Sequence, residues 1–264
     1  MDPDEKLSRA SSFETVAVTY ADHRPDYPED AVRWLVGGDG RPVQVLELGA
    51  GTGKLTRVLC ALGHQVIATD PSAAMLAQLV RAAPRSHVTL ARAEDIPLPP
   101  SSVDVVIAAQ AFHWFDQSRA LPDIARVLRP GGVLSLVWND GDIKVPWVKK
   151  IFALMHDPGA EGVDPLRESD IFSTFEQRVF RHWQPVNRDS LVGFIASSSK
   201  AATLTPAGRT DLLAEAAAIY DSYDRGSAGM RLPWKTHCFR ARVSGNATAT
   251  EPASDDDGLL IDFR

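Results

Sequence analysis

A short stretch of the chain, residues 43–55, constrains the fold more than any other. It reads VQVLELGAGTGKL, an apolar run that ends in Glu47-Leu48 and is followed by three glycines in five residues. Apolar residues at nearly every position are typical of a strand buried on both faces of a parallel sheet. Leucine and valine then recur at helical spacing up to Leu62, and Gly63 follows as a helix stop. The stretch therefore predicts a strand, a glycine turn and a helix.

The spacing of the glycines separates three kinds of ligand site. A dinucleotide fingerprint, G-x-G-x-x-G, would need a glycine where the chain has Lys54. A phosphate-binding P-loop would need a glycine and a hydroxyl where the chain has Leu48 and Leu55. The remaining pattern is acid-x-G-x-G-x-G, and a carboxylate at the mouth of such a turn favours a ligand with a cationic end. A purely structural glycine turn is the alternative.

Composition narrows the class of protein. With 264 residues, of which 44% are hydrophobic, the chain suits one large α/β domain, with or without a lid. Its net charge of −6 argues against a nucleic-acid backbone or an anionic membrane as the main partner. Cys60 and Cys238 are the two cysteines, so we expect no disulfide and a reducing compartment. With no apparent signal peptide, membrane helix or metal-ligand spacing, the sequence predicts a cytoplasmic protein.

Further strands follow the glycine turn at a regular rhythm. Residues 65–70 predict a second strand that ends in Asp70, which lies 23 residues after Glu47. That is close to the position of a ribose-binding carboxylate in nucleotide-binding βαβ units. Ser72 is a plausible N-cap for the next helix. A third strand at 87–90 leads into a loop at 91–99, whose backbone N–H groups and carboxylates are suited to an adenine edge.

The fourth strand, 103–109, is followed by the sequence QAFHWFD at 110–116. Open α/β sheets place their ligands at this end of their strands. Aromatic residues with a histidine predict a pocket floor and an acid/base group, His113. The alternative is ordinary packing of Phe112 and Trp114, with His113 in a structural hydrogen bond. A helix at 121–128, a turn at 129–132 and a fifth strand at 133–138 complete a doubly wound parallel sheet.

The remaining segments flank this core. Residues 13–20 predict a short helix ahead of a break at 24–28, and this segment either folds over a ligand or packs on the core. Residues 29–40 predict another helix. Apolar stripes at 148–155, 191–195 and 212–220 predict helices that serve as pocket wall, lid or core. The expected organisation is an N-terminal helical cap (1–40), a cofactor-binding core (41–140), substrate or lid helices with C-terminal strands (141–243) and a flexible acidic tail (244–264).

Four features together carry a resemblance to a known family: the E-x-G-x-G-x-G turn at 47–53, Asp70, the Ala-Glu-x-Ile-Pro loop at 93–97 and the RVLRPGG turn at 126–132. In these the chain resembles the class I S-adenosylmethionine-dependent methyltransferases. More narrowly it is similar to the type 11 group, which includes ubiquinone/menaquinone C-methyltransferases and trans-aconitate methyltransferases. The resemblance implies a Rossmann-like seven-stranded sheet whose last strand is antiparallel, supplied here by residues 230–243.

The resemblance also implies roles for individual residues. Gly49 and Gly51 would lie against the methionine part of S-adenosylmethionine, and Glu47 near its ammonium group. Asp70 would hold both ribose hydroxyls. The expected adenine neighbours are Ala93 and Glu94, Gln110 would lie beside the methionine and ribose, and Tyr20 and Arg24 match positions that close over cofactor or substrate. Arg24 either pairs with a carboxylate of the acceptor or forms a surface salt bridge.

The sequence thus predicts methyl transfer to a small-molecule acceptor by in-line displacement, in a monomer or homodimer. Phe112 and Trp114 are the expected substrate contacts. If the acceptor must lose a proton, His113 is the first candidate base and His23 the second. One alternative is a protein that binds S-adenosylmethionine or S-adenosylhomocysteine for regulation or to assist a cyclisation. Another, a nicotinamide oxidoreductase, is disfavoured by Lys54.

Overall fold

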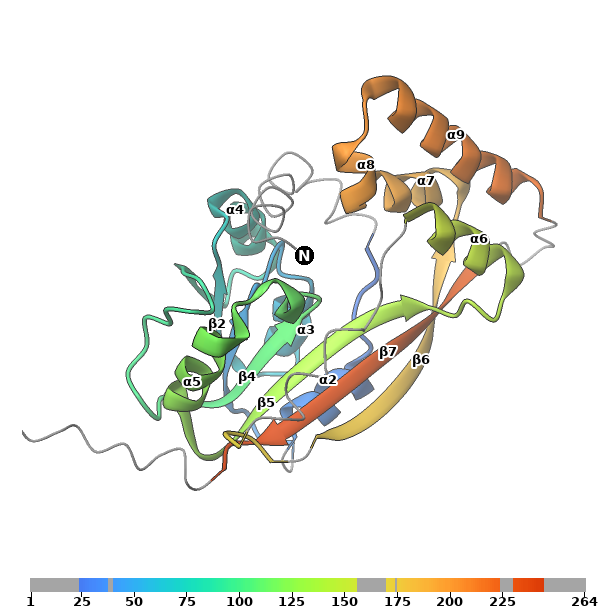
Figure 1. Cartoon of the computed structure of the whole chain (residues 1–264). Coiled ribbons are helices and arrows are strands. Elements are labelled where there is room, and N and C mark those ends of the chain that lie inside the picture. Colours follow the sequence, from blue (N-terminus) through green and yellow to red (C-terminus); the bar gives the residue numbers. More distant parts are fainter. Residues whose placement is uncertain (1–23, 38–39, 156–169, 174, 224–229, 245–264) are drawn as a thin grey trace, which may run out of the picture.

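The computed structural model describes residues 24–37, 40–155, 170–173, 175–223 and 230–244. Seven strands form one sheet, in the order β3-β2-β1-β4-β5-β7-β6 (Figure 1). The strands are β1 (Gln44–Leu48), β2 (Gln65–Asp70), β3 (His87–Leu90), β4 (Val103–Ala109), β5 (Leu128–Gly141), β6 (Glu176–Val186) and β7 (Met230–Arg242). The helices are α2 (Glu29–Val36), α3 (Lys54–Ala61), α4 (Ala73–Ala82), the 3-10 turn η1 (Phe112–Trp114), α5 (Gln117–Val127), α6 (Pro146–Met155), α7 (Arg188–Ala196), α8 (Ser199–Thr203) and α9 (Pro206–Asp221).

Strand direction confirms the predicted topology. The pairs β1·β2, β1·β4, β2·β3 and β4·β5 are parallel. Strand β7 runs antiparallel to both of its neighbours, β5 and β6. The sheet is therefore the Rossmann-like seven-stranded sheet whose last strand is antiparallel, and β7 lies where the strand at 230–243 was expected.

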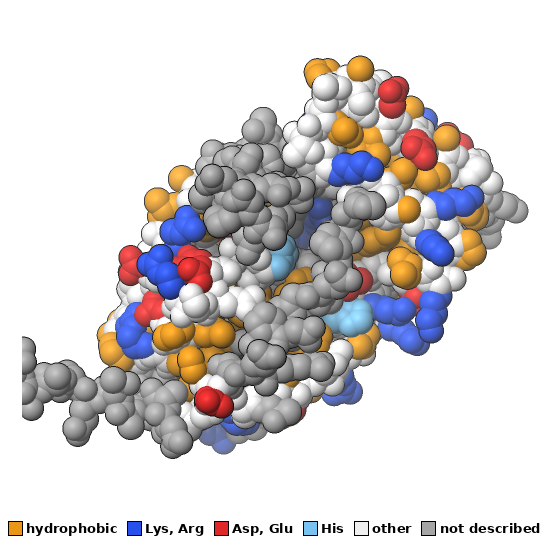
Figure 2. Space-filling view, viewed as in Figure 1, with side chains coloured by type: hydrophobic (Ala, Val, Ile, Leu, Met, Phe, Trp, Pro, Cys, Tyr) orange, Lys and Arg blue, Asp and Glu red, His pale blue; other side chains and the backbone are white. Residues whose placement is uncertain are grey.

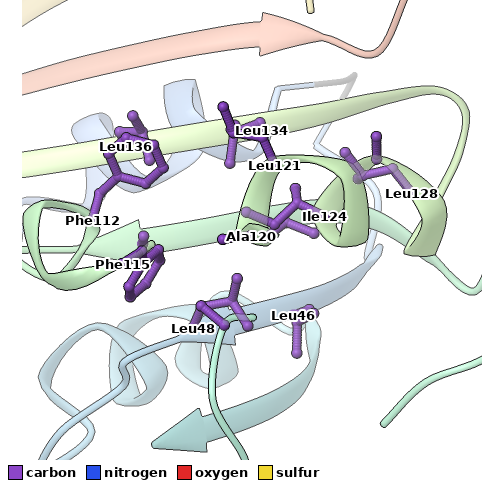
Figure 3. Close-up of a cluster of buried hydrophobic side chains, with 14 of the residues drawn as sticks. Leu46, Leu48, Phe112, Phe115, Ala120, Leu121, Ile124, Leu128, Leu134 and Leu136 are labelled. Carbon is purple, nitrogen blue, oxygen red and sulfur yellow. The ribbon is translucent and has the colours of Figure 1, made fainter. Parts of the chain in front are cut away.

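Two hydrophobic clusters cover opposite faces of the sheet, as strands buried on both sides require. Helices α2 and α3 bury one face through Leu35, Leu55 and Leu59. Helix α5 and η1 bury the other (Figure 3). There Leu46 and Leu48 of β1 and Leu134 and Leu136 of β5 meet Phe112, Phe115, Leu121 and Ile124. This two-sided core fixes the strand ends on which a ligand site can be built.

Helices α6 to α9 gather at one end of the long strands β5, β6 and β7 (Figure 1). They share a separate cluster with the ends of β6 and β7, in which Trp234 is 2% exposed. Inside this cluster the Trp234 ring meets Phe152 and Phe194 edge-on, at centroid distances of 5.5 and 5.4 Å. The three stripes at 148–155, 191–195 and 212–220 are indeed helical.

The bounds of one strand and one helix differ from the sequence prediction, and one further strand has no predicted position. The fifth strand was placed at 133–138, but β5 spans Leu128–Gly141. Its register with β4 shifts between Val103 and Val105, so the expected turn at 129–132 is a bulge that the sheet accommodates. The helix expected at 29–40 ends at Val36. The seven-stranded sheet implies a further C-terminal strand, but its position at β6 is not predicted because this edge strand is mostly exposed and lacks a simple apolar alternation.

Other predictions of the sequence fall outside the described residues, namely the helix at 13–20 and the tail at 245–264. None of the described helices is long and apolar enough to cross a membrane. Acidic and basic side chains both appear on the face shown in Figure 2.

Candidate active site

A pocket opens at the carboxyl ends of β1, β4 and β5, where open α/β sheets bind their ligands. Its walls come from the segment 24–27, the glycine turn and the ends of β4 and β5. The lining residues are Arg24, Pro25, Tyr27, Glu47, Gly49, Ala50, Gly51, Thr52, Lys54, Leu55, Ala109, Gln110 and Asn139. Its volume of about 60 Å³ is room for a few water molecules or for the charged end of an amino acid.

Two glycines of the turn have different functions in its geometry. Both have positive φ, 66° at Gly49 and 55° at Gly51, which disfavours any residue with a side chain. A Cβ atom on Gly49 would lie 2.6 Å from the Cβ atom of Ala111, whereas one on Gly51 would meet nothing within 4 Å. Gly49 thus lets the turn pack against the start of η1, and Gly51 leaves its backbone open to a ligand.

Glu47 is a buried acid at the base of the pocket. Its side chain is 1% exposed and accepts a hydrogen bond of 2.6 Å from the Thr56 hydroxyl. Burial raises the pKa of Glu47 to about 8, against the opposing effect of the Thr56 hydrogen bond. Close by, the buried Thr52 hydroxyl has no hydrogen-bond partner among the described residues. A ligand ammonium group would complement both, because it is cationic and carries several N–H donors.

Asp70 ends β2 and is joined directly to the glycine turn. Its two carboxylate oxygens accept hydrogen bonds from the backbone N–H groups of Gly51 and Ser72, both at 2.9 Å. Burial raises the pKa of Asp70, while these two bonds oppose the shift. Ser72 caps α4 as predicted, since its hydroxyl accepts from the Met75 N–H. The structure therefore brings Asp70 and Gly51 together, although Asp70 does not line the pocket itself.

The loop at 91–98 packs against the start of α5. The Glu94 carboxylate accepts a hydrogen bond of 2.8 Å from the backbone N–H of Asp116 and pairs with Arg92 at 3.4 Å. Ala93 is buried in the core, 6% exposed. Neither Ala93 nor Glu94 lines the pocket, so a ligand that reached both would extend beyond it.

Gln110 lies in the pocket wall as predicted. It adopts φ 55°, which is uncommon for a residue other than glycine and is typical of strained functional positions. Its side-chain amide donates to the backbone oxygen of Asn139 at 3.1 Å, and its own N–H donates to Val137. The end of β4 is thereby fastened to β5.

The aromatic loop after β4 divides into two parts. Phe112 is fully buried and packs edge-on against Phe115, so its ring offers no surface to a ligand in this structure. For Phe112 the structure agrees with ordinary packing. The rings of His113 and Trp114 are partly exposed and contact each other at 4.7 Å between centroids. Neither lines the pocket, and both stay candidates for contact with an acceptor.

Arg24 lies in the pocket wall and makes contacts that the sequence did not suggest. Its Nε and Nη2 atoms donate to the hydroxyl and backbone oxygen of Ser197, at 3.2 and 3.3 Å. The guanidinium also lies over the Phe194 ring, 5.2 Å from its centroid. Arg24 therefore binds the end of α7, which neither of its two predicted roles anticipated. Tyr20 and His23 lie outside the described residues.

Lys54 anchors the same segment from the opposite side. Its ammonium group donates to the backbone oxygen of Arg24 at 2.7 Å and lies 3.4 Å from the Asp26 carboxylate. Arg57 pairs with Asp26 as well, at 2.8 Å. In the sequence, Lys54 is informative only because it excludes a dinucleotide fingerprint. Its place at the start of α3, facing the turn, was the signal that could have suggested a further role.

Comparisons with known proteins identify the family of the chain. Residues 46–136 match the family described as "Methyltransferase domain". An uncharacterized methyltransferase of Mycobacterium tuberculosis (strain ATCC 25618 / H37Rv) is 38% identical over 239 residues, which are 88% of this chain and 96% of the relative. The chain belongs to the class I S-adenosylmethionine-dependent methyltransferases. Its cofactor is S-adenosylmethionine, and the buried acid, the open glycine turn and Asp70 fit that group.

Solved structures of methyltransferases share the fold. A type II methyltransferase from Anaeromyxobacter dehalogenans superposes with a TM-score of 0.63 at 29% identity, covering 83% of this chain and 97% of that one. A methyltransferase from an antibiotic biosynthesis pathway of Anabaena variabilis superposes with a TM-score of 0.61 at 20% identity, covering 82% and 98%. The narrower likeness to quinone or trans-aconitate enzymes stays a prediction.

Proposed function

We propose that this methyltransferase acts on a small molecule that binds between the glycine turn and helices α6 to α9. The observation that carries the proposal is the closure of the pocket. Residues 24–27 form one wall, and they are fastened to α7 through Arg24 and to α3 through Lys54. A partly covered pocket suits a small acceptor better than the surface of a polymer. The net charge of −6 also disfavours a polyanionic acceptor.

The proposed cofactor contacts follow from the residues around the turn. Glu47 faces the ammonium group, and Gly49 and Gly51 lie along the methionine part. Asp70 binds the ribose hydroxyls through lone pairs that its two backbone hydrogen bonds leave available. Ala93 and Glu94 flank the adenine, while Gln110 lies beside the methionine and ribose, with Tyr20 closing over them.

When bound, S-adenosylmethionine supplies an electrophilic methyl group on its sulfonium. The residues of the chain must therefore align the acceptor with the carbon–sulfur bond and exclude water. His113 and Trp114 form the acceptor side, with the buried Phe112 packed beneath them, and Arg24 orients an acceptor carboxylate. Where the acceptor must lose a proton, the imidazole of His113 takes it, with His23 as the second candidate.

One relative supports an acid-bearing acceptor. A malonyl-[acyl-carrier protein] O-methyltransferase of Enterobacter lignolyticus is 34% identical over 137 residues, which are 51% of this chain and 55% of the relative. The shared part lies within a protein whose name gives as acceptor a malonyl group on an acyl-carrier protein, so it supports the acid group of the acceptor and not its size. We therefore place small carboxylic acids first among the acceptors, ahead of phenols and amines.

The test is methyl transfer from S-adenosylmethionine to a panel of small acids, phenols and amines, measured as S-adenosylhomocysteine formed. At least one class should raise turnover clearly above the rate without acceptor. The variant His113→Ala should bind S-adenosylhomocysteine as the wild type does. It should lose turnover with a phenol or amine acceptor, which must lose a proton, and keep turnover with a carboxylate, which is already deprotonated at neutral pH. Binding of the cofactor with no turnover on any class would contradict a small-molecule acceptor and favour the regulatory alternative.

A further inference from the structure

Next to the pocket, three strands carry a polar row that the proposed site does not use. The row consists of Asn139 on β5, Thr236 on β7 and His182 on β6. Asn139 and Thr236 are paired across β5 and β7 and are both buried, 5% and 0% exposed. A buried row of polar groups is costly unless each group is held by a partner, so its hydrogen bonds show what it does.

The donor and the acceptor of the hydrogen bonds that join Thr236, Asn139 and Asp26 can be assigned. The Thr236 hydroxyl donates to Asn139 Oδ1 at 2.6 Å, and Asn139 Nδ2 donates a longer bond of 3.4 Å to the backbone oxygen of Asp26. His182 Nδ1 lies 3.3 Å from the same hydroxyl. Because that hydroxyl has one proton and gives it to Asn139, its contact with His182 is a hydrogen bond in the tautomer whose proton is on Nδ1, with the hydroxyl as acceptor.

These contacts fix which end of the Asn139 side-chain amide faces Thr236 and which end faces Asp26. If the amide were turned by half a rotation, its oxygen would face the backbone oxygen of Asp26 and both would be acceptors. The acceptor-only oxygen of Asp26 therefore selects the orientation in which an N–H group points at it, and the Thr236 hydroxyl holds the amide there by donating to Oδ1. The backbone oxygen of Asn139 meanwhile accepts from Gln110. Asn139 thus connects two walls of the pocket, the segment 24–28 and the end of β4.

We propose that Thr236 is a positioning residue for the cofactor pocket: it orients Asn139, which holds the segment 24–28 over the pocket, and His182 supports Thr236 from behind. The inference rests on the proposed use of this pocket for the cofactor. It adds residues from β6 and β7, the strands farthest from the glycine turn, to the machinery of that site. A hydroxyl that only stabilised the fold would change the free energy of unfolding and leave ligand affinity unchanged.

The experiment is calorimetric titration of S-adenosylhomocysteine into the wild type, Thr236→Val and Thr236→Ser. Valine keeps the shape of threonine and removes the hydroxyl, and serine restores the hydroxyl without the methyl group. We expect valine to weaken binding about five- to tenfold, as the loss of one oriented hydrogen bond does, and serine to stay within about twofold of the wild type. Affinity in Thr236→Val equal to that of the wild type would overturn the inference.

The wild type supplies the control for the function itself. If the folded wild type fails to bind S-adenosylhomocysteine, the proposed function is wrong. If the wild type binds and Thr236→Val binds equally well, only the positioning role is wrong. Unfolding midpoints of each variant show that the proteins compared are folded.

His182 is tested by His182→Phe, which keeps an aromatic ring beside Trp234. The His182 and Trp234 rings are nearly parallel, 14° apart, with centroids separated by 6.4 Å. The variant should weaken binding about two- to threefold alone and add no loss to Thr236→Val, because both changes break one chain. A full additional loss in the double variant, or none in His182→Phe alone, would overturn the placement of His182 behind Thr236. Should Thr236→Val fail to fold, His182→Phe carries the test.

Discussion

The two walls of the pocket are built in different ways. The glycine-turn wall is local, since Glu47, Gly49 and Gly51 lie within five residues and Asp70 ends the next strand. The opposite wall is assembled from residues far apart in the chain, such as Arg24 and Ser197, which are separated by 173 positions. The local wall carries the features shared by the family. The assembled wall combines parts that have no common sequence motif, and it faces the proposed acceptor.

This difference suggests that the local wall sets whether the cofactor binds and the assembled wall sets what is methylated. Substitutions in the local wall should therefore change the free energy of unfolding and the cofactor affinity strongly. Substitutions in the assembled wall should change the cofactor affinity less and the use of the acceptor more.

The largest effect should come from the buried acid of the local wall. In the folded protein without ligand, the pKa of Glu47 is raised to about 8 from its usual value of 4.5. Between these values the folded state keeps a proton that the unfolded state has lost, so stability falls as the pH rises. The loss is about 1.4 kcal/mol per pH unit and about 5 kcal/mol at most over the whole window.

Glu47→Gln should remove this slope. The measurement is the free energy of unfolding in urea at several pH values, for the wild type, Glu47→Gln and the exposed control Glu29→Gln. The difference in unfolding free energy between the wild type and Glu47→Gln should change between pH 4.5 and about 8. Above about pH 8 that difference should stay constant, and the curve of the control should follow that of the wild type. Parallel curves for the wild type and Glu47→Gln would show that the acid is not shielded from water.

The two glycines offer a matched pair for the next effect. Gly49→Ala places a Cβ atom 2.6 Å from Ala111, in addition to the strain of a positive φ. It should cost about 2–4 kcal/mol of unfolding free energy, whereas Gly51→Ala, which meets no neighbour, should cost about 1 kcal/mol. Urea unfolding without ligand measures both. Equal losses would mean that the close approach of the turn to η1 is absent.

Asp70→Asn tests the junction between the turn and the second strand. An amide has one acceptor oxygen, so either Gly51 or Ser72 loses its partner, and the proposed ribose contact loses its charge. The dissociation constant for S-adenosylhomocysteine should rise about 30-fold, as the loss of a charged hydrogen bond predicts. Asp104→Asn, at the other end of the sheet, is the control and should bind normally. Comparable affinity in the two variants would remove Asp70 from the site.

The features that could be predicted from the sequence belong mostly to the local wall, and those that could not belong mostly to the assembled wall. The glycine turn, Asp70, Ser72 and the antiparallel last strand were predictable because each depends on residues within one βαβ unit or on a family motif. The interpretation of Phe112 as a substrate contact was less secure, because an aromatic ring beside a strand end can turn into the core or away from it. Only the packing of α5 shows which occurs.

The contacts of Arg24 and Asn139 could not be predicted by spacing. Arg24 meets Ser197 only because the fold brings the end of α7, 173 positions away, against it, and Asn139 meets Thr236 only because β7 inserts beside β5. The position of strand β6 was missed for a related reason. As the edge strand it buries few of its side chains, so the apolar signal that identifies the central strands is absent.

Among the changes to the two walls, the smallest effect on the cofactor should come from Arg24→Lys in the assembled wall. Lysine keeps the charge but lacks the planar fork that reaches both the hydroxyl and the backbone oxygen of Ser197. Losing one such bond should weaken S-adenosylhomocysteine binding about fivefold. If Arg24 orients the acceptor carboxylate, Arg24→Lys should raise the KM of an acid acceptor by more than about fivefold. Titration and steady-state kinetics measure the two effects separately.

Arg57→Lys is the matched control, because among the described residues the Arg57 side chain pairs with the half-exposed carboxylate of Asp26 alone, and such pairs contribute little. If Arg24→Lys weakened cofactor binding as much as Asp70→Asn, the division between the walls would fail. The segment 24–28 would then be part of the cofactor site itself. If instead it changed only the KM of the acceptor, the two walls would separate cofactor from substrate, and the choice of acceptor would be traced to Arg24 and the end of α7.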